Sequence, residues 1–454
     1  MNNRFLQNGD RYKNLRLSTL LIQKRCDPGK DLDYDGLPDL SRQGAHHMKL
    51  KVFFYSFLFA VVPCFASLAH AQTFSVIHNF TGGADGAGPR TGVTINKGAL
   101  YGTTFQGGSG NTGAIYQIKK NGDNWVTVPV FNFPADGSGG TSPWGRVLFG
   151  QDGHIYGTTY QGGPNNNGVV FSLTPPSSVC KTVNCQDFWK EQVLHSFGVF
   201  GDGQYPTGDL LWDQQGNIYG TTNSGGSSYD VGAVYEMTPS QNGWTESLAY
   251  AFGDRPDPWG PDSGVISDAN GNLFGTSTNG GTNNTGTVFE LKYVVGVGWT
   301  ETTLYNFLNE DDGSGPFGGL VMDGSGNLFG TTVVGYHGVR DWTIFELSPA
   351  GDTWTYKLLY TGTGAIGPVK SLAMDAAGNL YGTTAGGGSY YAGNVFNLSN
   401  TENGWVYTSL YDFTGGNDGH EPVSNVSIDT DGTLYGTASY GGLYNQGVVW
   451  MIKP

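Results

Sequence analysis

The stretch Tyr101-Gly102-Thr103-Thr104 decides the fold, because its pattern of an aromatic residue, glycine, threonine and a small residue recurs along the chain. The other copies begin at Tyr156, Tyr219, Phe274, Phe329, Tyr381 and Tyr435, at intervals of 52 to 63 residues. Self-similarity at a period of this length indicates a repeat architecture in which each repeat is one unit of supersecondary structure. We therefore expect seven structural units.

Each unit contains four short runs of β-branched and aromatic residues. In residues 318–360 the runs are Gly319–Met322, Asn327–Thr332, Thr343–Leu347 and Trp354–Tyr360, and turns rich in Gly and Asp separate them. Such runs predict strands, and no segment has the sustained 3.6-residue period of a helix. The pattern predicts an all-β, seven-bladed β-propeller of four-stranded antiparallel blades. A parallel β-helix is the rival fold, although its coils are usually shorter and lack a four-strand meander.

The two ends of the repeat region complement each other. The last repeat stops after its third run, Val448–Ile452, while Phe74–Phe80 matches the fourth-run pattern of Leu304–Phe307 and Leu410–Phe413. We expect the N-terminal strand to complete the last blade, which closes the ring and protects strand edges from pairing with other chains. Residues 72–454 are thus predicted to form the propeller.

The repeated residues have expected structural roles. The glycine of the block should let neighbouring blades approach closely, and the turn aspartates should accept bonds from backbone N–H groups. Tryptophans should begin the outer strands, where blades are widest. These turn aspartates are Asp213, Asp268, Asp323, Asp375 and Asp429, and the tryptophans are Trp125, Trp189, Trp244, Trp299, Trp354 and Trp405.

Residues 48–71 read as a secretory signal peptide. A basic start precedes the apolar run Val52–Ala66, and Ala69-His70-Ala71 is a small-residue cleavage pattern before Gln72. An uncleaved membrane anchor is the alternative. Residues 1–47 then form a mis-called or disordered N-terminal extension. The protein is expected to be secreted, periplasmic or on the cell surface, with no membrane span in the mature chain.

The N-terminal extension carries one ligand pattern. Asp31, Asp33, Asp35 and Asp39 have the spacing of a calcium loop, and Gly36 provides its turn. The twelfth loop position holds an arginine where a bidentate glutamate is usual. Whether this loop binds calcium stays open, as does the true start of the chain.

Charge and cysteine content exclude several classes of function. The chain has 23 basic and 38 acidic residues, a net charge of −15, which leaves no basic patch for nucleic acid. Cys180 and Cys185 are expected to form a small disulfide in an oxidising compartment. The histidines of residues 72–454 show no metal-ligand spacing, and no dinucleotide or phosphate-binding pattern is present. No metal or cofactor is expected.

The repeat resembles the bacterial GloVer tandem repeat of choice-of-anchor proteins. Gly271-Asn272-Leu273-Phe274-Gly275-Thr276, the loop Gly280-Gly281 and Gly286-Thr287-Val288-Phe289-Glu290-Leu291 carry the resemblance, and similar copies cover nearly all of residues 74–454. The resemblance implies an exported or surface repeat protein and brings no catalytic residues.

Strand parity places two recurring loops on one face of the predicted propeller. Loops from the fourth to the first strand carry Asp-Gly, and loops from the second to the third strand carry Gly-Gly with Asn and Tyr. Rings, amides and carboxylates suit sugars, but they also suit ordinary turns. The ligand-binding candidates are Asp85, Asp136, Asp202, Asp312, Asp418, Tyr229, Tyr390 and Tyr444.

Three functions remain open. The first is a non-catalytic exported protein that binds an extracellular glycan or protein through the loop-rich face, and we expect it to be a monomer. The second is a secreted polysaccharide hydrolase or lyase that uses loop carboxylates, although no catalytic constellation is recognisable. The third is a purely structural surface module.

Overall fold

The structure is a computed structural model that describes residues 72–177, 189–198, 201–333, 341–363 and 366–454. The described residues all belong to one compact unit. Three sequence predictions lie outside the described residues: the signal peptide at 48–71, the calcium loop from Asp31 to Asp39, and the disulfide between Cys180 and Cys185. They stay predictions.

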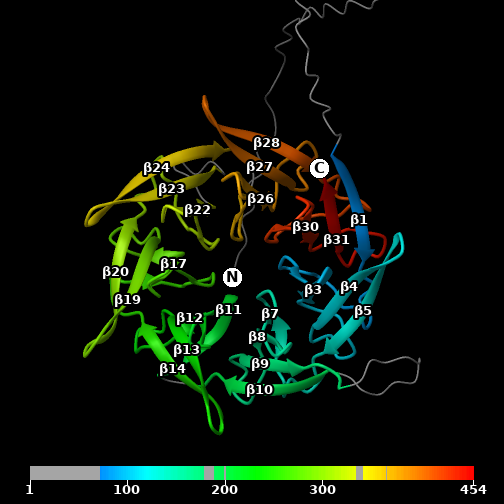
Figure 1. Cartoon of the computed structure of the whole chain (residues 1–454), viewed down its shortest axis with the longest axis horizontal. Helices are drawn as coiled ribbons and strands as arrows, with labels where there is room; N and C mark the ends of the chain where they lie inside the picture. The colour runs from blue at the N-terminus through cyan, green and yellow to red at the C-terminus, as the bar shows by residue number, and fades with distance from the viewer. Residues whose placement is uncertain (1–71, 178–188, 199–200, 334–340, 364–365) are drawn as a thin grey trace, which may run out of the picture. The chain divides into compact units, whose positions relative to one another are not determined.

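Within the described residues the chain forms seven antiparallel blades and no helix, which confirms the predicted all-β propeller. The blades surround a centre, and β1, β5, β10, β14, β20, β24 and β28 form the outer strands (Figure 1). This part of the chain accordingly has no helix of the length and apolar character needed to cross a bilayer.

Each of the first four blades runs from an inner strand to an outer strand, and the inner strand is short in every one except blade 3. Blade 1 contains β2 (Thr94–Asn96), β3 (Ala99–Thr104), β4 (Ala114–Asn121) and β5 (Asn124–Asn132). Blade 2 contains β6 (Thr141–Pro143) with β7 (Leu148–Phe149), then β8 (Ile155–Gln161), β9 (Val169–Thr174) and β10 (Lys190–Ser196). In blade 3 the inner strand is longer, and the strands are β11 (Gly203–Trp212), β12 (Ile218–Gly225), β13 (Ala233–Ser240) and β14 (Gly243–Ala251). Blade 4 contains β16 (Ile266–Ser267), β17 (Leu273–Ser277), β19 (Thr287–Val294) and β20 (Gly298–Asn306), beside the small pair β15 (Pro258–Trp259) and β18 (Asn279–Gly280).

The last three blades follow the same order. Blade 5 contains β21 (Val321–Met322), β22 (Leu328–Thr332), β23 (Trp342–Ala350) and β24 (Thr353–Gly362). Blade 6 contains β25 (Ala373–Met374), β26 (Leu380–Thr384), β27 (Asn394–Thr401) and β28 (Gly404–Asp412). Blade 7 contains β29 (Ser427–Ile428), β30 (Leu434–Ala438), β31 (Val448–Lys453) and β1 (Thr73–Asn79).

The N-terminal strand closes the ring as predicted. Strand β1 pairs antiparallel with β31, in a register that runs from Thr73 opposite Lys453 to Asn79 opposite Val448. The pairing gives the last blade its fourth strand and covers the edge of β31. Chain segments from the two ends therefore share one hydrophobic core, in which Phe74 and Val76 pack against Trp450 and its neighbours.

The repeated block links each blade to the next because alternate side chains of a strand face opposite sides. Its aromatic residue meets the outer-strand tryptophan of the following blade, edge to face, at 5.8 Å for Tyr219 and Trp299. Four other pairs share this geometry: Trp125 with Tyr435, Tyr156 with Trp244, Phe274 with Trp354, and Phe329 with Trp405. The tryptophans thus fill the wide outer space between blades, as expected.

The first threonine of the block faces the same neighbour and binds its backbone. The Thr276 hydroxyl donates to the carbonyl oxygen of Gly318 at 3.0 Å, just before the inner strand of the next blade. Five equivalent bonds run from Thr103 to Gly145, Thr221 to Ser263, Thr331 to Pro368, Thr383 to Ser424, and Thr437 to Thr91. The last of these bonds joins blade 7 to blade 1.

The glycine of the block has a role that differs from the expected one. A Cβ at Gly330 would lie 2.5 Å from Cζ of Phe345, its cross-strand partner in the same blade. All seven block glycines lie against an aromatic ring of the third strand: Tyr116, Phe171, Tyr235, Phe289, Phe345, Phe396 or Trp450. The glycine therefore makes room for a buried ring of its own blade, rather than for the neighbouring blade directly.

The turn aspartates act as expected. Asp323 accepts hydrogen bonds from the backbone N–H groups of Ser325 and Asn327 and from the side-chain amide of Asn327. Asp213, Asp268 and Asp375 make the same set of backbone bonds. These bonds fix the tight turn between the first and second strands.

Replacing Gly330 by alanine should destabilise the propeller, because the new Cβ must displace the fully buried ring of Phe345. Overpacking of this kind costs about 1–3 kcal/mol of unfolding free energy. Gly324→Ala in the same blade is the matched control, since its Cβ meets nothing within 4 Å. Chemical denaturation measures both variants, and equal stability of the two would contradict the packing role of the glycine.

Removing β1 should open the ring. A chain that begins at Thr81 leaves the edge of β31 unpaired and uncovers the core around Trp450. We expect a loss of more than about 5 kcal/mol, the upper end of what one core truncation costs. Thermal unfolding and gel filtration test this, with the chain that begins at Gln72 as the control; unchanged stability of the shorter chain would refute closure by β1.

Candidate functional site

The two recurring loops lie together on one face, as strand parity predicts. In blade 1 the backbone N–H of Gly108, in the Gly-Gly loop, donates to the carbonyl of Gly83 in the Asp-Gly loop at 2.8 Å. The same loop-to-loop bond runs from Gly163 to Gly137, Gly226 to Asp202, Gly281 to Asp257, and Gly442 to Gly416. We call the face formed by these loops the loop-rich face.

Most of the predicted binding aspartates hold their own loops. Asp312 accepts hydrogen bonds from the hydroxyl of Tyr305 at 3.0 Å and from the backbone N–H groups of Leu308 and Glu310. Asp85, Asp202 and Asp418 make equivalent bonds, each to a histidine or tyrosine seven residues earlier and to a backbone N–H four residues earlier. Their oxygens are therefore largely engaged.

Asp136 differs, because it is exposed and its bonds from other described residues come from the backbone N–H and hydroxyl of Ser138, which lower its pKa. No hydrogen bond or ion pair within the described residues joins two of the five predicted aspartates. They occupy separate loops around the face. A ligand-binding role for them stays a prediction.

The predicted tyrosines are available to solvent. Tyr229, Tyr390 and Tyr444 are each more than half exposed in the Gly-Gly loops of blades 3, 6 and 7. Tyr391 beside Tyr390 is exposed as well. The loop-rich face therefore presents separate aromatic rings, and the structure does not gather them into one cluster.

A chain of cavities runs along the centre of the ring. A cavity of about 330 Å³ opens among loops of the loop-rich face, a second of about 440 Å³ lies among the inner strands, and a third of about 410 Å³ follows. The first two share Asp262, Phe317 and Lys370, and the last two share Arg146 and Asp209. We call the three cavities the channel and the first one the channel mouth.

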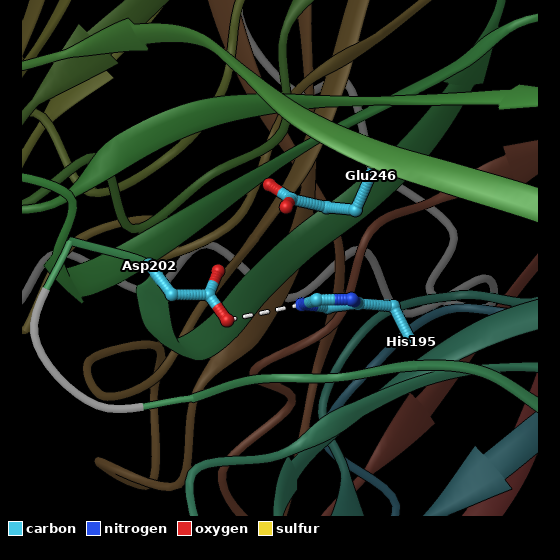
Figure 2. Close-up of side chains that lie close together, drawn as sticks. All are labelled: His195, Asp202 and Glu246. Atoms are coloured by element: carbon cyan, nitrogen blue, oxygen red, sulfur yellow. Dashed lines mark hydrogen bonds and ion pairs between the residues drawn. The ribbon is translucent and has the colours of Figure 1, made fainter.

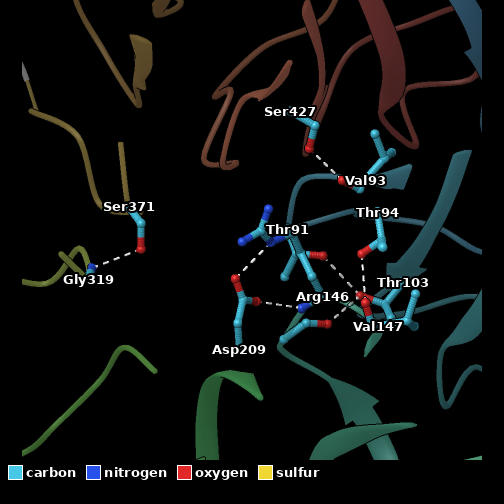
Figure 3. A network of polar contacts seen from close by, with 11 residues as sticks. Thr91, Val93, Thr94, Thr103, Arg146, Val147, Asp209, Gly319, Ser371 and Ser427 are labelled. Atoms are coloured by element: carbon cyan, nitrogen blue, oxygen red, sulfur yellow. Dashed lines mark hydrogen bonds and ion pairs between the residues drawn. The ribbon is translucent and has the colours of Figure 1, made fainter. Parts of the chain in front are cut away.

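An ion pair lies inside the channel. The backbone N–H and Nε of Arg146 donate to the two carboxylate oxygens of Asp209, each at 2.7 Å (Figure 3). Burial alone would raise the pKa of Asp209, but the arginine and its N–H group hold that pKa below its usual value. On the opposite wall the Ser371 hydroxyl accepts a bond from the backbone of Gly319. The pair joins blades 2 and 3 through side chains that the repeat pattern does not specify.

Two further cations lie at the channel mouth around one tryptophan. The guanidinium of Arg90 lies 5.2 Å from the ring centre of Trp144 and 4.3 Å from that of Phe105. The ammonium of Lys370 lies 5.5 Å from the same tryptophan ring. Among the described residues neither cation has a carboxylate within 4 Å. The mouth therefore offers cations that are stacked on aromatic rings but are not ion-paired.

Burial changes the ionisation of the groups at the mouth. It lowers the pKa of Lys370, an effect that the negative charges of Asp209 and Asp262 partly offset. It raises the pKa of Asp262, which accepts a bond from the amide of Asn223. A ligand carboxylate beside Lys370 would favour the charged form of this lysine. Asp262 and Glu421 offer acceptors for hydroxyl groups of the same ligand.

Sequence reasoning did not select these residues. Arg90, Arg146 and Lys370 each follow the recurring loop proline by one to three residues, in blades 1, 2 and 6. The available signal was a basic residue shortly after the loop proline in an acidic chain. The other blades have no basic residue there, and so a comparison of the repeats did not reveal it.

Outer strands of blades 2, 3 and 4 carry a glutamate two residues after the tryptophan. Burial raises the pKa of Glu191, Glu246 and Glu301 to about 7 in each case. Oε1 is buried and has no hydrogen-bond partner among the described residues in Glu191 and in Glu246, whereas Glu301 accepts a bond from Thr303. These carboxyl groups favour the neutral form in the folded protein.

The raised pKa of Glu191 predicts a pH-dependent stability. The folded state retains a proton that the unfolded chain releases above a pKa near 4.5, so this stabilisation is complete below pH 4.5 and is lost as pH rises towards 7. Glu191→Gln should raise the melting temperature at pH 8 and leave it unchanged at pH 4.5. Glu402→Gln, an exposed position, is the control in the same thermal scans; an equal shift in both variants would contradict this account.

Several solved structures are similar to the chain. A protein of Bacteroides uniformis described as a 6-phosphogluconolactonase has 14% identity and a TM-score of 0.46, over 71% of this chain and 83% of that one. PorZ of Porphyromonas gingivalis, a bacterial surface component of the type-IX secretion system, has 15% identity and a TM-score of 0.46, over 81% of this chain and 47% of that one. At such TM-scores neither carries an argument about function.

Comparisons of sequence give a clearer result. Among curated proteins none matches the chain significantly. The model of the Gloeobacter/Verrucomicrobia repeat matches residues 64–189, 186–360 and 297–454, which together span the propeller. This agrees with the resemblance carried by the Gly-Asn-Leu-Phe-Gly-Thr blocks. The chain belongs to the Gloeobacter/Verrucomicrobia repeat family.

Proposed function

We propose that this protein is an exported, non-catalytic binding propeller that holds an acidic glycan at the channel mouth on its loop-rich face. The observation that carries the proposal is the pair of cations Arg90 and Lys370, which surround Trp144 beside a cavity of about 330 Å³ and have no carboxylate within 4 Å in the described part of the chain. A sugar carboxylate or sulfate is the partner such cations accept.

The remaining groups of the mouth suit the rest of a sugar. Asp262 and Glu421 offer acceptors for hydroxyl groups, and Phe317 and Tyr440 provide apolar surface for ring faces. The exposed tyrosines of the Gly-Gly loops, among them Tyr390 and Tyr444, offer further aromatic surface on the same face. A polymeric glycan would use both regions, with its charged unit at the mouth.

A binding role accords better with the loop carboxylates than catalysis does. Asp85, Asp202, Asp312 and Asp418 each accept several bonds from their own loop, which leaves few free lone pairs for proton transfer. Export is part of the proposal and rests on the signal-like sequence of residues 48–71.

Binding of the full chain to an array of neutral, sulfated and uronic-acid glycans tests the proposal. We expect acidic glycans to bind, and Lys370→Met to lower their affinity at least tenfold, because a charge-assisted bond contributes about 1.5–3 kcal/mol. Lys357→Met on outer strand β24 is the matched control and should bind as the wild type does, since this lysine pairs with Glu346 away from the channel.

Other outcomes of the same experiment would overturn the proposal. Binding of neutral glycans alone, or equal affinity in the Lys370→Met variant, would place the ligand elsewhere. New reducing ends after incubation with the bound polysaccharide would favour the secreted hydrolase or lyase instead. Capture of a specific protein without any glycan binding would favour a protein partner.

A further inference from the structure

A histidine and two carboxylates meet between the outer parts of blades 2 and 3 (Figure 2). His195 belongs to outer strand β10, Asp202 to the loop before β11, and Glu246 to outer strand β14. One possible ligand atom from each residue lies within 4.8 Å of the other two. The group lies away from the channel, so it is separate from the proposed glycan site.

The side chains converge on one point. Nε2 of His195 lies 3.1 Å from Oδ2 of Asp202, and the Glu246 carboxylate points toward both of them (Figure 2). Asp202 is held in place by the backbone N–H groups of Gly198 and Gly203, which donate to Oδ2 and Oδ1 respectively. The carboxylate is thus oriented by bonds that do not depend on the other two side chains.

Glu246 lacks the partner that its burial requires. Its Oε1 atom is buried and accepts no hydrogen bond from the described residues. No lysine or arginine in the described part of the chain lies within 4 Å of Asp202 or Glu246. Two carboxylates so close together, with one oxygen that is buried and has no donor among the described residues, favour a proton or a cation between them.

Other interfaces between blades show which side chains occupy the equivalent positions. At the interface of blades 4 and 5 the equivalent residues are Tyr305, Asp312 and Tyr356. The Tyr305 hydroxyl donates to Asp312, and the rings of Tyr305 and Tyr356 stack. His78 and Asp85 repeat the 3.1 Å bond of the first pair, but the position equivalent to Glu246 is Thr127. Across the described blades, a second carboxylate joins a His–Asp pair only at the interface of blades 2 and 3.

We propose that His195, Asp202 and Glu246 form a binding site for a divalent transition-metal ion, with Zn²⁺ as the best match. One imidazole nitrogen and two carboxylate oxygens are a ligand set that Zn²⁺ accepts, with water in the fourth position. The ion neutralises both carboxylates and gives the buried Oε1 its partner. Because its ligands come from two outer strands and a loop, the ion would clamp blades 2 and 3 together.

Spacing in the sequence did not reveal this site. Seven residues separate His195 from Asp202, and 44 more separate Asp202 from Glu246, which matches no familiar local ligand motif. Only the side-by-side packing of two blades brings the three residues together. Asp202 also has its loop-holding bonds, so one residue would serve both the loop and the ion.

Zinc stoichiometry of the full chain, purified without a histidine tag and freed of metal by a chelator, tests the proposal. Equilibrium dialysis against Zn²⁺ with elemental analysis measures the bound metal. We expect one ion that is lost in His195→Tyr and bound at least tenfold more weakly by Glu246→Gln. His195→Tyr should fold, because Tyr–Asp pairs occupy the same position at Tyr305 and Tyr411.

His78→Tyr is the matched control, since it changes the equivalent pair that lacks a third ligand. It should bind as much Zn²⁺ as the wild type, and Zn²⁺ should raise the melting temperature of both but not that of His195→Tyr. No bound Zn²⁺ in the wild type would overturn the proposal and leave a shared proton as the link between the carboxylates. Equal binding by His195→Tyr and the wild type would overturn it as well.

Discussion

The contact between successive blades is the constraint on which the rest of the structure depends. A four-stranded sheet of this size has two apolar faces and cannot bury either alone, so each blade needs a neighbour on both sides. The repeated block meets this need residue by residue. Its aromatic residue packs on the tryptophan of the next blade and its first threonine binds the backbone of that blade, while its glycine admits a third-strand ring on the opposite side.

Closure follows from the same contacts. The bond from Thr437 to the carbonyl of Thr91 is the sixth member of the threonine series, and it joins blades whose sequences lie at opposite ends of the propeller. The pairing of β1 with β31 then adds main-chain bonds within blade 7. Thr158 is the exception in the series, since its hydroxyl is buried and has no partner among the described residues. At that interface the ion pair of Arg146 and Asp209 joins blades 2 and 3 instead.

The fold was predictable because every structural role is repeated seven times, and repetition exposes a pattern that one copy would hide. Blade number, strand order, ring closure, turn aspartates and the pairing of the loops were all accessible in this way. The proposed site could not be predicted, for the opposite reason. Arg90, Trp144 and Lys370 occupy positions that differ from blade to blade. Most of the repeated aspartates chosen as ligands hold their own loops, and a ligand-binding role for them stays a prediction. Which unrepeated side chains meet at the axis is set by the closed ring, and single-sequence reasoning does not supply that geometry.

The side chains of the channel mouth lie apart from the contacts that hold the blades together. Inner strands such as β21 and β25 are only two residues long, so the loops that precede them reach the axis and supply the channel mouth. Substitutions there leave the aromatic and threonine contacts between blades intact. The outer parts of the interfaces between blades also vary in their side chains. Equivalent positions hold Tyr305, Asp312 and Tyr356 between blades 4 and 5, and His195, Asp202 and Glu246 between blades 2 and 3. A ring held together by the contacts of its second strands can therefore vary both its centre and its rim, and the two proposed sites lie at these two places.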